Sequence, residues 1–333
     1  MPQLTLVTGS GGFIGGHLVR DLVAKGVSVR AVDKKPLDHW YFRSQEAENI
    51  TADLQSAEAC DMAAKGAVHV YNLACDMGGM GFIENNRALC MLSVLINTHM
   101  LMSAQKHGVE RFFYSSSACI YPGYKQTNAD VTALKEADAY PADCEDGYGW
   151  EKLFSERLCR HFSEDFRLKT RVARYHNVYG PYGTWDGGRE KAPAAVSRKV
   201  AMAVLQGKHE IEIWGDGEQT RSFMYIDDCL HGTQTLLHSD VEEPLNIGSD
   251  ELVTINQLVD VVEEIAGIKL KRHYKFDAPK GVRGRNSDNT LIKAKLGWAP
   301  CISLRAGMEK TYRWIYDQAK AREEGRPYMM AAA

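Results

Sequence analysis

A glycine-rich turn between a short hydrophobic run and a helix-like segment constrains this chain more than any other feature. Gly9-Ser10-Gly11-Gly12-Phe13-Ile14-Gly15 directly follows the β-branched run Leu4–Thr8. Glycines permit a tight turn, and they let backbone N–H groups and the start of a helix face an anionic ligand. Such a turn between a strand and a helix predicts a doubly wound parallel α/β sheet, a Rossmann fold that binds a dinucleotide pyrophosphate.

Two acidic residues follow where such a sheet binds the rest of a dinucleotide. Asp33 ends the next strand-like run, eighteen residues after Gly15, where a carboxylate accepts hydrogen bonds from an adenosine ribose. A carboxylate there repels a 2′-phosphate, so we expect NAD rather than NADP as the cofactor. Asp53 comes after the following strand, and we expect it to bond the adenine amino group.

The first half of the chain alternates β-branched runs with helical stretches, as in a parallel sheet covered by helices. From Gly180 the sequence pattern changes to that of a loop followed by shorter helices and strands. This pattern predicts a smaller α/β substrate domain. We expect strands near residues 4–8, 28–33, 69–74, 111–117 and 170–175, and helices near 12–25, 56–65, 86–107 and 148–166. We expect an NAD-binding domain over residues 1–180, to which residues 222–240 return, and the substrate domain over residues 181–330.

Composition places the chain among ordinary globular proteins. Hydrophobic residues make up 44% and charged residues 25%, and the net charge is −3 with scattered basic residues, so we expect no nucleic-acid partner. We expect no membrane span and no signal peptide. The eight cysteines include no Cys-x-x-Cys pair, and the histidines lack metal-ligand spacing. We therefore expect a cytoplasmic protein with reduced cysteines and no metal.

The predicted helix over residues 86–107 is apolar on nearly every side. Its apolar residues are spread around it: Leu89, Met91, Leu92, Val94, Leu95, Ile96, Met100 and Leu101. A helix of that kind is buried all round, either in the core or in a subunit interface.

Tyr148 and Lys152 are four residues apart and share one face of a predicted helix. A nearby ammonium stabilises a phenolate, so Lys152 would lower the pKa of Tyr148 from its reference value of about 10. Such a pair is common by accident on solvated helices. Here it follows the glycine-rich turn and Ser115-Ser116-Ser117, and in that context it predicts a redox catalytic pair.

This combination of motifs resembles the extended short-chain dehydrogenase/reductase family, whose members mostly act on nucleotide sugars. The resemblance covers nearly the whole chain and includes Asn72-Leu73-Ala74, Asn177-Val178-Tyr179-Gly180-Pro181 and the stretch 214–228. In that family the last stretch holds the nucleotide diphosphate. The resemblance implies cofactor contacts from Gly9, Gly12, Phe13, Ile14, Gly15, Asp33, Asp53, Leu73, Ala74, Tyr148 and Lys152.

Further segments narrow the resemblance to one branch. Cys119 lies just past Ser117, Lys191 lies in a loop near Gly187 and Gly188, and 76–81 is a glycine-rich loop. Together with residues 281–289, these segments closely resemble the GDP-mannose 3,5-epimerases. The resemblance implies Tyr148, Lys152, Cys119, Lys191 and Ser117 as catalytic residues. It implies a substrate site of Gly78, Gly79, Ser117, Ala118, Cys119, Tyr148, Asn177, Glu190, Lys191, Ala192, Lys199, Gln219, Thr220, Arg221 and Arg285.

The implied reaction converts GDP-D-mannose to GDP-L-galactose, with a C5-only product (GDP-L-gulose) plausible alongside. Oxidation of C4 to a ketone acidifies the hydrogens on C3 and C5; Tyr148 would take the hydroxyl proton while NAD takes the hydride, and Ser117 would bond the same oxygen. Cys119 and Lys191 are the candidate base and acid, because a thiolate near the positive nicotinamide is stabilised and a desolvated lysine gives up its proton more readily. Re-reduction of C4 regenerates NAD. The resemblance also implies a homodimer joined by a four-helix bundle of residues 86–107 and 148–166.

Other readings stay open at this point. GDP-4-keto-6-deoxymannose epimerase-reductase (GDP-fucose synthase) also uses a cysteine after the serine, but it consumes NADPH, which Asp33 opposes. It has a histidine after its Gly-Pro turn, where this chain has Tyr182. Dehydratases of the family carry an Asp-Glu pair where this chain has Ala118-Cys119, and a simple 4-epimerase needs no thiol. A non-catalytic NAD-sensing module would usually have lost the Tyr148 and Lys152 pair.

Overall fold

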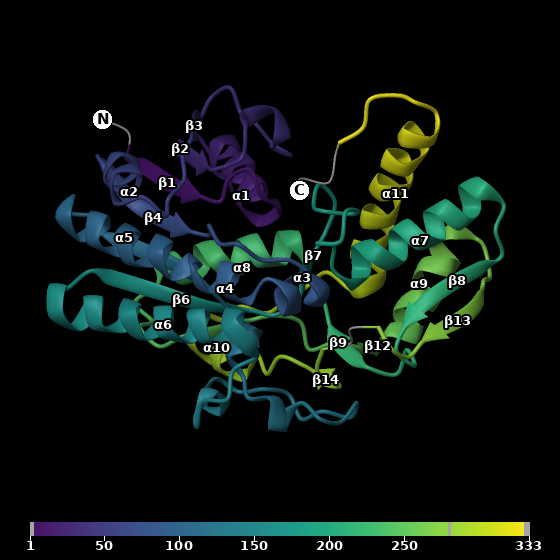
Figure 1. Ribbon diagram of the computed structural model, residues 1–333. Helices are drawn as coiled ribbons and strands as arrows, with labels where there is room; N and C mark the ends of the chain where they lie inside the picture. The colour runs from purple at the N-terminus through teal and green to yellow at the C-terminus, as the bar shows by residue number, and fades with distance from the viewer. Residues whose placement is uncertain (1–2, 279–280, 330–333) are drawn as a thin grey trace.

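The computed structural model describes residues 3–278 and 281–329. Within these residues the main sheet has seven strands, and every neighbouring pair is parallel: β1 (Leu4–Thr8), β2 (Ser28–Asp33), β3 (Glu48–Thr51), β4 (Ala67–Asn72), β5 (Arg111–Ser117), β6 (Lys169–Tyr175) and β11 (Leu245–Ile247). Their order is β11-β6-β5-β4-β1-β2-β3. Helices pack on both faces of the sheet, and a smaller group of helices and short strands lies beside it (Figure 1). The predicted doubly wound parallel α/β fold is confirmed.

Neighbouring residues of each central strand serve opposite faces of the sheet. Leu6 and Phe112 belong to one apolar cluster, and the adjacent Val7 and Phe113 belong to another, although all four are fully buried. Because side chains alternate along a strand, apolar residues at consecutive positions require a cover on each face. The cover consists of α2 (Ala57–Ala64), α5 (Ser93–Lys106) and α6 (Asp146–Phe166) on one face, and of α1 (Phe13–Ala24) and α8 (Ile226–His238) on the other.

The expected strand bounds hold for β1, β2 and β5 and need correction elsewhere. The strand expected at 69–74 is β4, which ends at Asn72, because the N–H groups of Leu73 and Ala74 both donate to the Thr8 hydroxyl instead of to a strand. β6 begins one residue earlier than expected, at Lys169. The strand β11 was not expected, since three apolar residues carry no periodic signal.

The stretch 86–107 departs most from the expectation. It forms two helices, α4 (Arg87–Met91) and α5, because the chain tightens at Leu92, whose carbonyl accepts from Leu95, three residues on. It is also not buried all round, since Met91, Leu92, Leu95 and Met102 are exposed. Of the two alternatives, burial of every side in the chain's own core is wrong.

We expected no segment long and apolar enough to span a membrane, and this stretch shows that expectation to be wrong. Residues 87–106 are long and apolar enough to cross a bilayer by length and composition. Ile96, Met100 and Leu101, however, belong to the core cluster under the sheet, and α5 packs against α2 and α6. Its apolar character therefore serves the packing of this fold.

The smaller group holds three helices that pack on one another, α7 (Ala192–Gln206), α9 (Ile255–Ala266) and α11 (Leu304–Glu323). Its parallel pair is β8 (Glu210–Trp214) with β13 (Lys271–Lys275), and a mixed sheet contains β12 (Leu252–Thr254), β9 (Thr220–Ser222) and β14 (Gly284–Arg285). The remaining elements are α3 (Met80–Asn85), β7 (Val178–Tyr179), β10 (Met224–Tyr225) and α10 (Thr290–Leu296). The helix α8 packs against β5 and β6 of the main sheet. The domain boundary at residue 180 stays a prediction, and the end at residue 330 lies outside the described residues.

The position of α7 is set by local sequence. Pro193 lies in its first turn, where a missing N–H costs nothing, and Gly207 ends it at a φ of +63°. Lys191 is the N-cap residue. The loop that carries Lys191 is therefore anchored to a rigid helix.

Candidate active site

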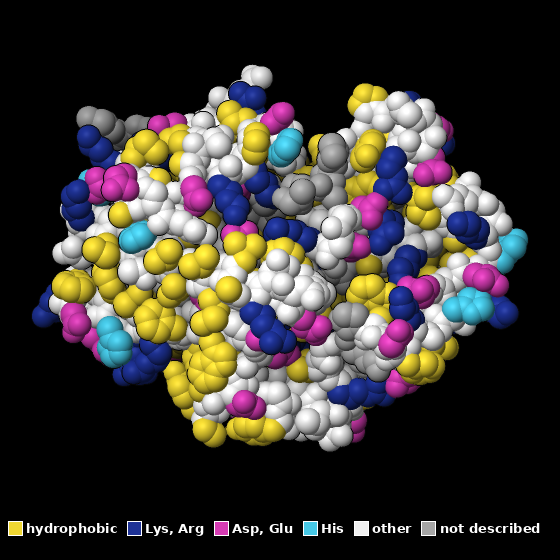
Figure 2. Space-filling model, viewed as in Figure 1, with side chains coloured by type: hydrophobic (Ala, Val, Ile, Leu, Met, Phe, Trp, Pro, Cys, Tyr) yellow, Lys and Arg dark blue, Asp and Glu magenta, His cyan; other side chains and the backbone are white. Residues whose placement is uncertain are grey.

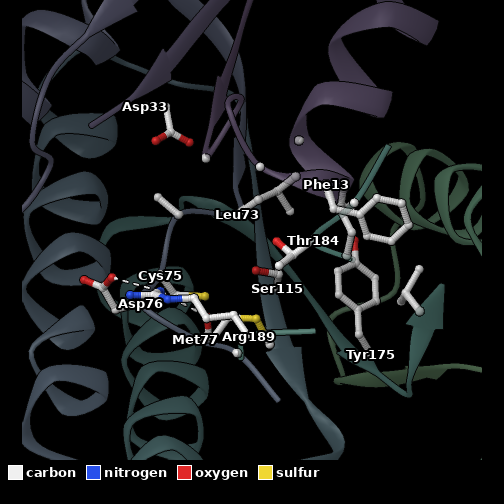
Figure 3. A pocket seen from close by; sticks show the side chains of 18 of the residues that line it. Phe13, Asp33, Leu73, Cys75, Asp76, Met77, Ser115, Tyr175, Thr184 and Arg189 are labelled. Atoms are coloured by element: carbon white, nitrogen blue, oxygen red, sulfur yellow. Dashed lines mark hydrogen bonds and ion pairs between the residues drawn. The ribbon is translucent and has the colours of Figure 1, made fainter. Parts of the chain in front are cut away.

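A cavity of about 470 Å³ lies at the carboxyl ends of the strands, where the strand order reverses between β1 and β4. Parallel α/β sheets bind their ligands at such a switch point. Every predicted cofactor residue except Lys152 lines the cavity: Gly9, Gly12, Phe13, Ile14, Gly15, Asp33, Asp53, Leu73, Ala74 and Tyr148. Figure 3 shows Phe13, Asp33 and Leu73 around it.

The glycines make the turn close enough for a pyrophosphate. Gly9 has a φ of +71°, and a Cβ on Gly15 would lie 2.2 Å from the Gly9 carbonyl oxygen. Within the described chain, no side chain caps the N-terminus of α1 at Gly12. The first backbone N–H groups of α1 are thus open to a negatively charged ligand, which fits the diphosphate of NAD.

The Asp33 carboxylate is held in one orientation by two backbone N–H groups. Its two carboxylate oxygens accept from the N–H groups of Gly11 (3.0 Å) and Lys35 (2.9 Å), and the side chain is buried. The neighbouring Lys34 pairs with Asp76 at 2.7 Å. Lys34 therefore has a carboxylate partner of its own, whereas Lys35 also lines the cavity and interacts with the Asp33 charge. The Asp33 carboxylate remains the group expected to disfavour a 2′-phosphate.

A second cavity of about 270 Å³ opens from the first. The two share Met77, Gly78, Ser117, Tyr148, Tyr175 and Lys191. The second cavity contains all the predicted substrate residues except Thr220: Gly78, Gly79, Ser117, Ala118, Cys119, Tyr148, Asn177, Glu190, Lys191, Ala192, Lys199, Gln219, Arg221 and Arg285.

Thr220 is the exception because of strand geometry. Gln219 and Arg221 line the cavity on either side of it, and successive side chains of a strand point in opposite directions. The Thr220 hydroxyl donates to the Ala129 carbonyl instead. The expectation that Thr220 contacts substrate is not met by this arrangement.

Tyr148 and Ser117 line both cavities, and Lys152 lies behind the cavity wall next to Tyr148. Burial raises the pKa of Tyr148 well above its ordinary value, while a hydrogen bond with Ser117 lowers it. The Lys152 ammonium lies 5.6 Å from the Tyr148 ring centre and is almost fully buried. In these surroundings the phenol is neutral, and its activation by the Lys152 charge stays a prediction.

Cys119 belongs to the 3₁₀ turn (Ala118–Ile120) that follows β5. The turn packs closely on α6, since a Cβ on Gly149 would lie 2.3 Å from the Cys119 carbonyl oxygen. Burial and the charge of Glu145 raise the pKa of Cys119, while Arg285 and a hydrogen bond from Ser117 act in the opposite direction. The protein groups alone therefore do not lower the pKa of Cys119, and the lowering expected from the positive nicotinamide stays a prediction.

Lys191 reaches both cavities from the N-terminus of α7. Burial lowers its pKa, against the opposing effects of Cys119 and Cys75. This is the direction expected for a lysine that donates a proton during turnover. The site thus joins a Tyr148-centred redox group to an ionisable thiol and an ionisable amine.

Two loops close over this junction. The N–H of Gly79 donates to the Arg189 carbonyl at 3.0 Å, and a Cβ on Gly79 would lie 2.6 Å from the Glu190 carbonyl oxygen. The Arg189 guanidinium stacks 3.8 Å from the centre of the Phe82 ring and reaches Asp76 (Figure 3). Gly79 is needed here because no larger residue allows that approach.

Residues 5–248 match the NAD dependent epimerase/dehydratase family. The chain belongs to this family. The expectations of an NAD-dependent enzyme and of NAD as the cofactor are therefore confirmed.

Members of this family with curated names include close relatives. GDP-mannose 3,5-epimerase 1 of Oryza sativa subsp. japonica is 49% identical over 94% of this chain and 81% of its own length. GDP-mannose 3,5-epimerase of Arabidopsis thaliana is 48% identical over 94% of this chain and 82% of its own. The resemblance drawn from the sequence motifs is thereby confirmed.

Other family members are more distant. GDP-L-fucose synthase 1 of Arabidopsis thaliana is 28% identical over 91% of this chain and 92% of its own length. The crystal structure of UDP-glucose 4-epimerase from Thermotoga maritima superposes with a TM-score of 0.85 at 27% identity, over 95% of this chain and 99% of that one. The NAD-dependent epimerase fold extends over almost the whole chain.

Several of the predicted substrate residues make hydrogen bonds within the protein itself. Lys199 donates to the Glu212 carbonyl at 2.7 Å, and the Asn177 side chain donates to the Ser222 carbonyl. Arg221 donates to the carbonyls of Thr220 and Val282. Their side chains still line the cavity, so their contact with substrate stays a prediction.

Glu145, Tyr175 and His176 are among the cavity residues that sequence reasoning missed. Burial lowers the pKa of His176 to about 3, so its ring is neutral, and it hydrogen-bonds Asn246. Glu145 lies three residues before Tyr148, a position that the Tyr-x-x-x-Lys pattern does not mark. In the described part of the chain, no three His, Cys, Asp or Glu residues gather into a metal site.

Proposed function

We propose that this chain is an isomerase that converts GDP-D-mannose to GDP-L-galactose, with GDP-L-gulose as a C5-only product. One observation carries the proposal: the acid–base candidates Cys119 and Lys191 line the same cavity as the redox residues Tyr148 and Ser117. The GDP-mannose 3,5-epimerases that are 48–49% identical to this chain support it. The more distant GDP-L-fucose synthase, at 28% identity, supports the alternative less.

Five residues, Tyr148, Ser117, Lys152, Cys119 and Lys191, divide the steps of the reaction among them. Tyr148 takes the proton of the C4 hydroxyl, with Ser117 bonded to the same oxygen and Lys152 stabilising the phenolate. NAD, when bound in the first cavity, would supply the reversible hydride chemistry at C4. The ketone makes the C3 and C5 hydrogens acidic, Cys119 removes such a proton, and Lys191 supplies one to the other face of the carbon. No outside oxidant is consumed.

The test is NMR of GDP-mannose incubated with the purified protein in D₂O, without added cofactor. We expect deuterium at C3 and C5, L-galactose signals, and a nucleotide released by acid that is NAD. A need for stoichiometric reductant, or release of NADP, would instead support the epimerase-reductase. Recovery of unlabelled GDP-mannose would rule out the 3,5-epimerase.

We also propose that the protein is a homodimer through α4, α5 and α6. Large hydrophobic side chains are exposed on these neighbouring helices, and Figure 2 shows hydrophobic side chains gathered over them on the left of the molecule. Monomers rarely leave a contiguous apolar face of this kind in water. The exposed members are Met91, Leu92, Leu95, Met102, Trp150, Phe154 and Phe166.

Sedimentation of a Phe154→Asp variant tests the homodimer. Phe154 is 55% exposed in the single chain, so its replacement has little effect on the chain's own core, whereas a charge in the interface opposes association. We expect the wild type at twice the mass of one chain and the variant at the mass of one chain. Phe276→Asp, which alters an exposed phenylalanine outside these helices, is the control and should remain dimeric.

For localisation we propose the cytosol. The eight cysteines, all within the described ranges, are free, which suits a reducing compartment. Fluorescence microscopy of the tagged protein checks this proposal.

A further inference from the structure

Arg285 holds three groups at once at the wall of the sugar cavity. Its Nε donates to Gln126 Oε1 at 2.7 Å, its Nη1 to the Cys119 sulfur at 3.6 Å, and its Nη2 to Glu145 Oε1 at 2.5 Å. The Arg285 side chain is 6% exposed. A guanidinium is always charged and has a fixed fork of donors, so it can serve a carboxylate and a sulfur together.

Glu145 reaches this triangle from the start of α6. Its backbone N–H donates to the Cys119 carbonyl at 3.0 Å, which ties the two residues together. One carboxylate oxygen pairs with Arg285, and the other is buried without a hydrogen-bond partner among the described residues. Glu145 lines the sugar cavity, although nothing in the cofactor chemistry or in the predicted site uses it.

We propose that Glu145 is a positioning residue for proton transfer: by sharing Arg285 with the Cys119 sulfur, it controls whether Cys119 is a thiol or a thiolate. The proposal rests on the proposed role of Cys119 as the base. Arg285 carries a single positive charge between two groups that become negative. With Glu145 ionised, that charge is already matched, and a thiolate becomes a second negative charge in a buried place.

Other ionisable groups also lie around Cys119. They are Lys191 of α7, Tyr148 of α6, Arg221 of β9 and Cys144. Burial and Glu145 raise the pKa of Cys119, and Arg285 lowers it, in agreement with the geometry. A resting thiol is also less prone to oxidation than a thiolate facing an open cavity.

The pH dependence of Cys119 alkylation tests the proposal. Purified protein with its bound cofactor is treated with iodoacetamide over a range of pH, and the Cys119 peptide is followed by mass spectrometry. Glu145→Gln keeps the shape and an oxygen acceptor for Arg285 while removing the charge. We expect the midpoint of Cys119 alkylation to fall by about one pH unit or more in this variant.

A matched control lies two residues away in the sequence. Arg283 pairs with Asp216 at 2.7 Å, much as Arg285 pairs with Glu145, but Asp216 does not line the cavity. Asp216→Asn should leave the Cys119 midpoint where it is in the wild type. An unchanged or raised midpoint in Glu145→Gln overturns the proposal, and so does an equal fall in Asp216→Asn.

Arg285→Gln tests the triangle from its other corner and covers the case in which Glu145→Gln does not fold. Loss of the guanidinium leaves Glu145 beside the sulfur, so the midpoint should rise; a fall or no change overturns the proposal. Alkylation requires no turnover. A failure here therefore leaves the epimerase proposal standing, and absence of epimerisation in D₂O leaves this result intact.

Discussion

The Lys152 ammonium lies 3.7 Å from the carboxylate of its sequence neighbour Glu151, and both side chains are almost completely buried. Glu151 also accepts hydrogen bonds from the Tyr114 and Ser155 hydroxyls, each at 3.0 Å. Burial alone would lower the pKa of Lys152, but the Cys75 thiolate, when it forms, and the Glu151 carboxylate outweigh it and raise that pKa. Glu151 thus keeps Lys152 a cation, which is the state that stabilises a Tyr148 phenolate.

Replacement of Tyr148 by phenylalanine should stop every step of the reaction. Without the phenol no ketone forms, so C3 and C5 stay too weakly acidic for Cys119. NMR in D₂O should show neither inverted sugar nor deuterium in the recovered GDP-mannose. The variant should keep its NAD, as released nucleotide will show; deuterium uptake at the wild-type rate would contradict the assignment.

Cys119→Ser and Lys191→Ala should separate the proton steps. Loss of the thiol should reduce deuterium uptake at both carbons by about 10²–10⁴-fold, the usual contribution of a general base. In Lys191→Ala, Cys119 still removes and returns a proton on its own face, so deuterium should enter mannose with little inversion. Substantial L-galactose from Cys119→Ser would return Cys119 to a packing role.

The proposed role of Lys191 as the acid also predicts how kcat changes at alkaline pH. An acid works only while protonated, so activity should fall as pH rises through the lowered pKa of Lys191. Lys191→Arg keeps the positive charge at every accessible pH, and its residual activity should lose that alkaline fall. A profile of kcat against pH checks this; an identical alkaline limb in both proteins would show that another group titrates.

Asp33→Asn should relax the choice of cofactor. The change removes the charge that opposes a 2′-phosphate, and the ratio of NADP to NAD affinity should rise about tenfold, or about 1.4 kcal/mol. Titration of cofactor-free protein with each nucleotide measures the ratio. Asp53→Asn serves as the control, since Asp53 lies on the adenine side and should leave the ratio unchanged.

Two buried histidines should make stability depend on pH. Burial lowers the pKa of His17 to about 4 and of His176 to about 3, from 6.5. Between these values the unfolded chain binds more protons than the folded one, so the free energy of unfolding falls as pH drops below 6.5. Each histidine contributes a slope of up to about 1.4 kcal/mol per pH unit. Urea unfolding should show a shallower slope for His176→Gln than for the wild type.

Gly79→Ala should loosen the two loops that close over the site. Its Cβ would lie 2.6 Å from the Glu190 carbonyl oxygen, so the loops must separate. We expect enzyme-bound NADH fluorescence to accumulate during turnover as the ketone escapes before C4 is reduced again. Gly81→Ala is the matched control, since nothing in the described structure lies within 4 Å of a Cβ there.

The sequence is most informative where backbone and residue type decide the outcome. The glycine turn and the strands β1, β2 and β5 could be predicted because close approach and consecutive apolar residues leave few alternatives. Glu145 could not, since a carboxylate before a helix is ordinary until the fold brings Arg285 from the other end of the chain against it. The direction of the Thr220 side chain could not be predicted without the register of β9. The break at Leu92 could not be predicted without the packing of α4 and α5.

The hydrogen bond between Gly79 and the Arg189 carbonyl has a further consequence for how long one enzyme molecule works. Every turnover passes through a moment when the sugar is a ketone and the nicotinamide is reduced. A molecule that releases the ketone at that moment holds a cofactor in the wrong oxidation state and can accept no new substrate. The number of cycles that one copy completes therefore depends on whether C4 is reduced again before the loops separate, and backbone contacts that take no part in the proton transfers decide it.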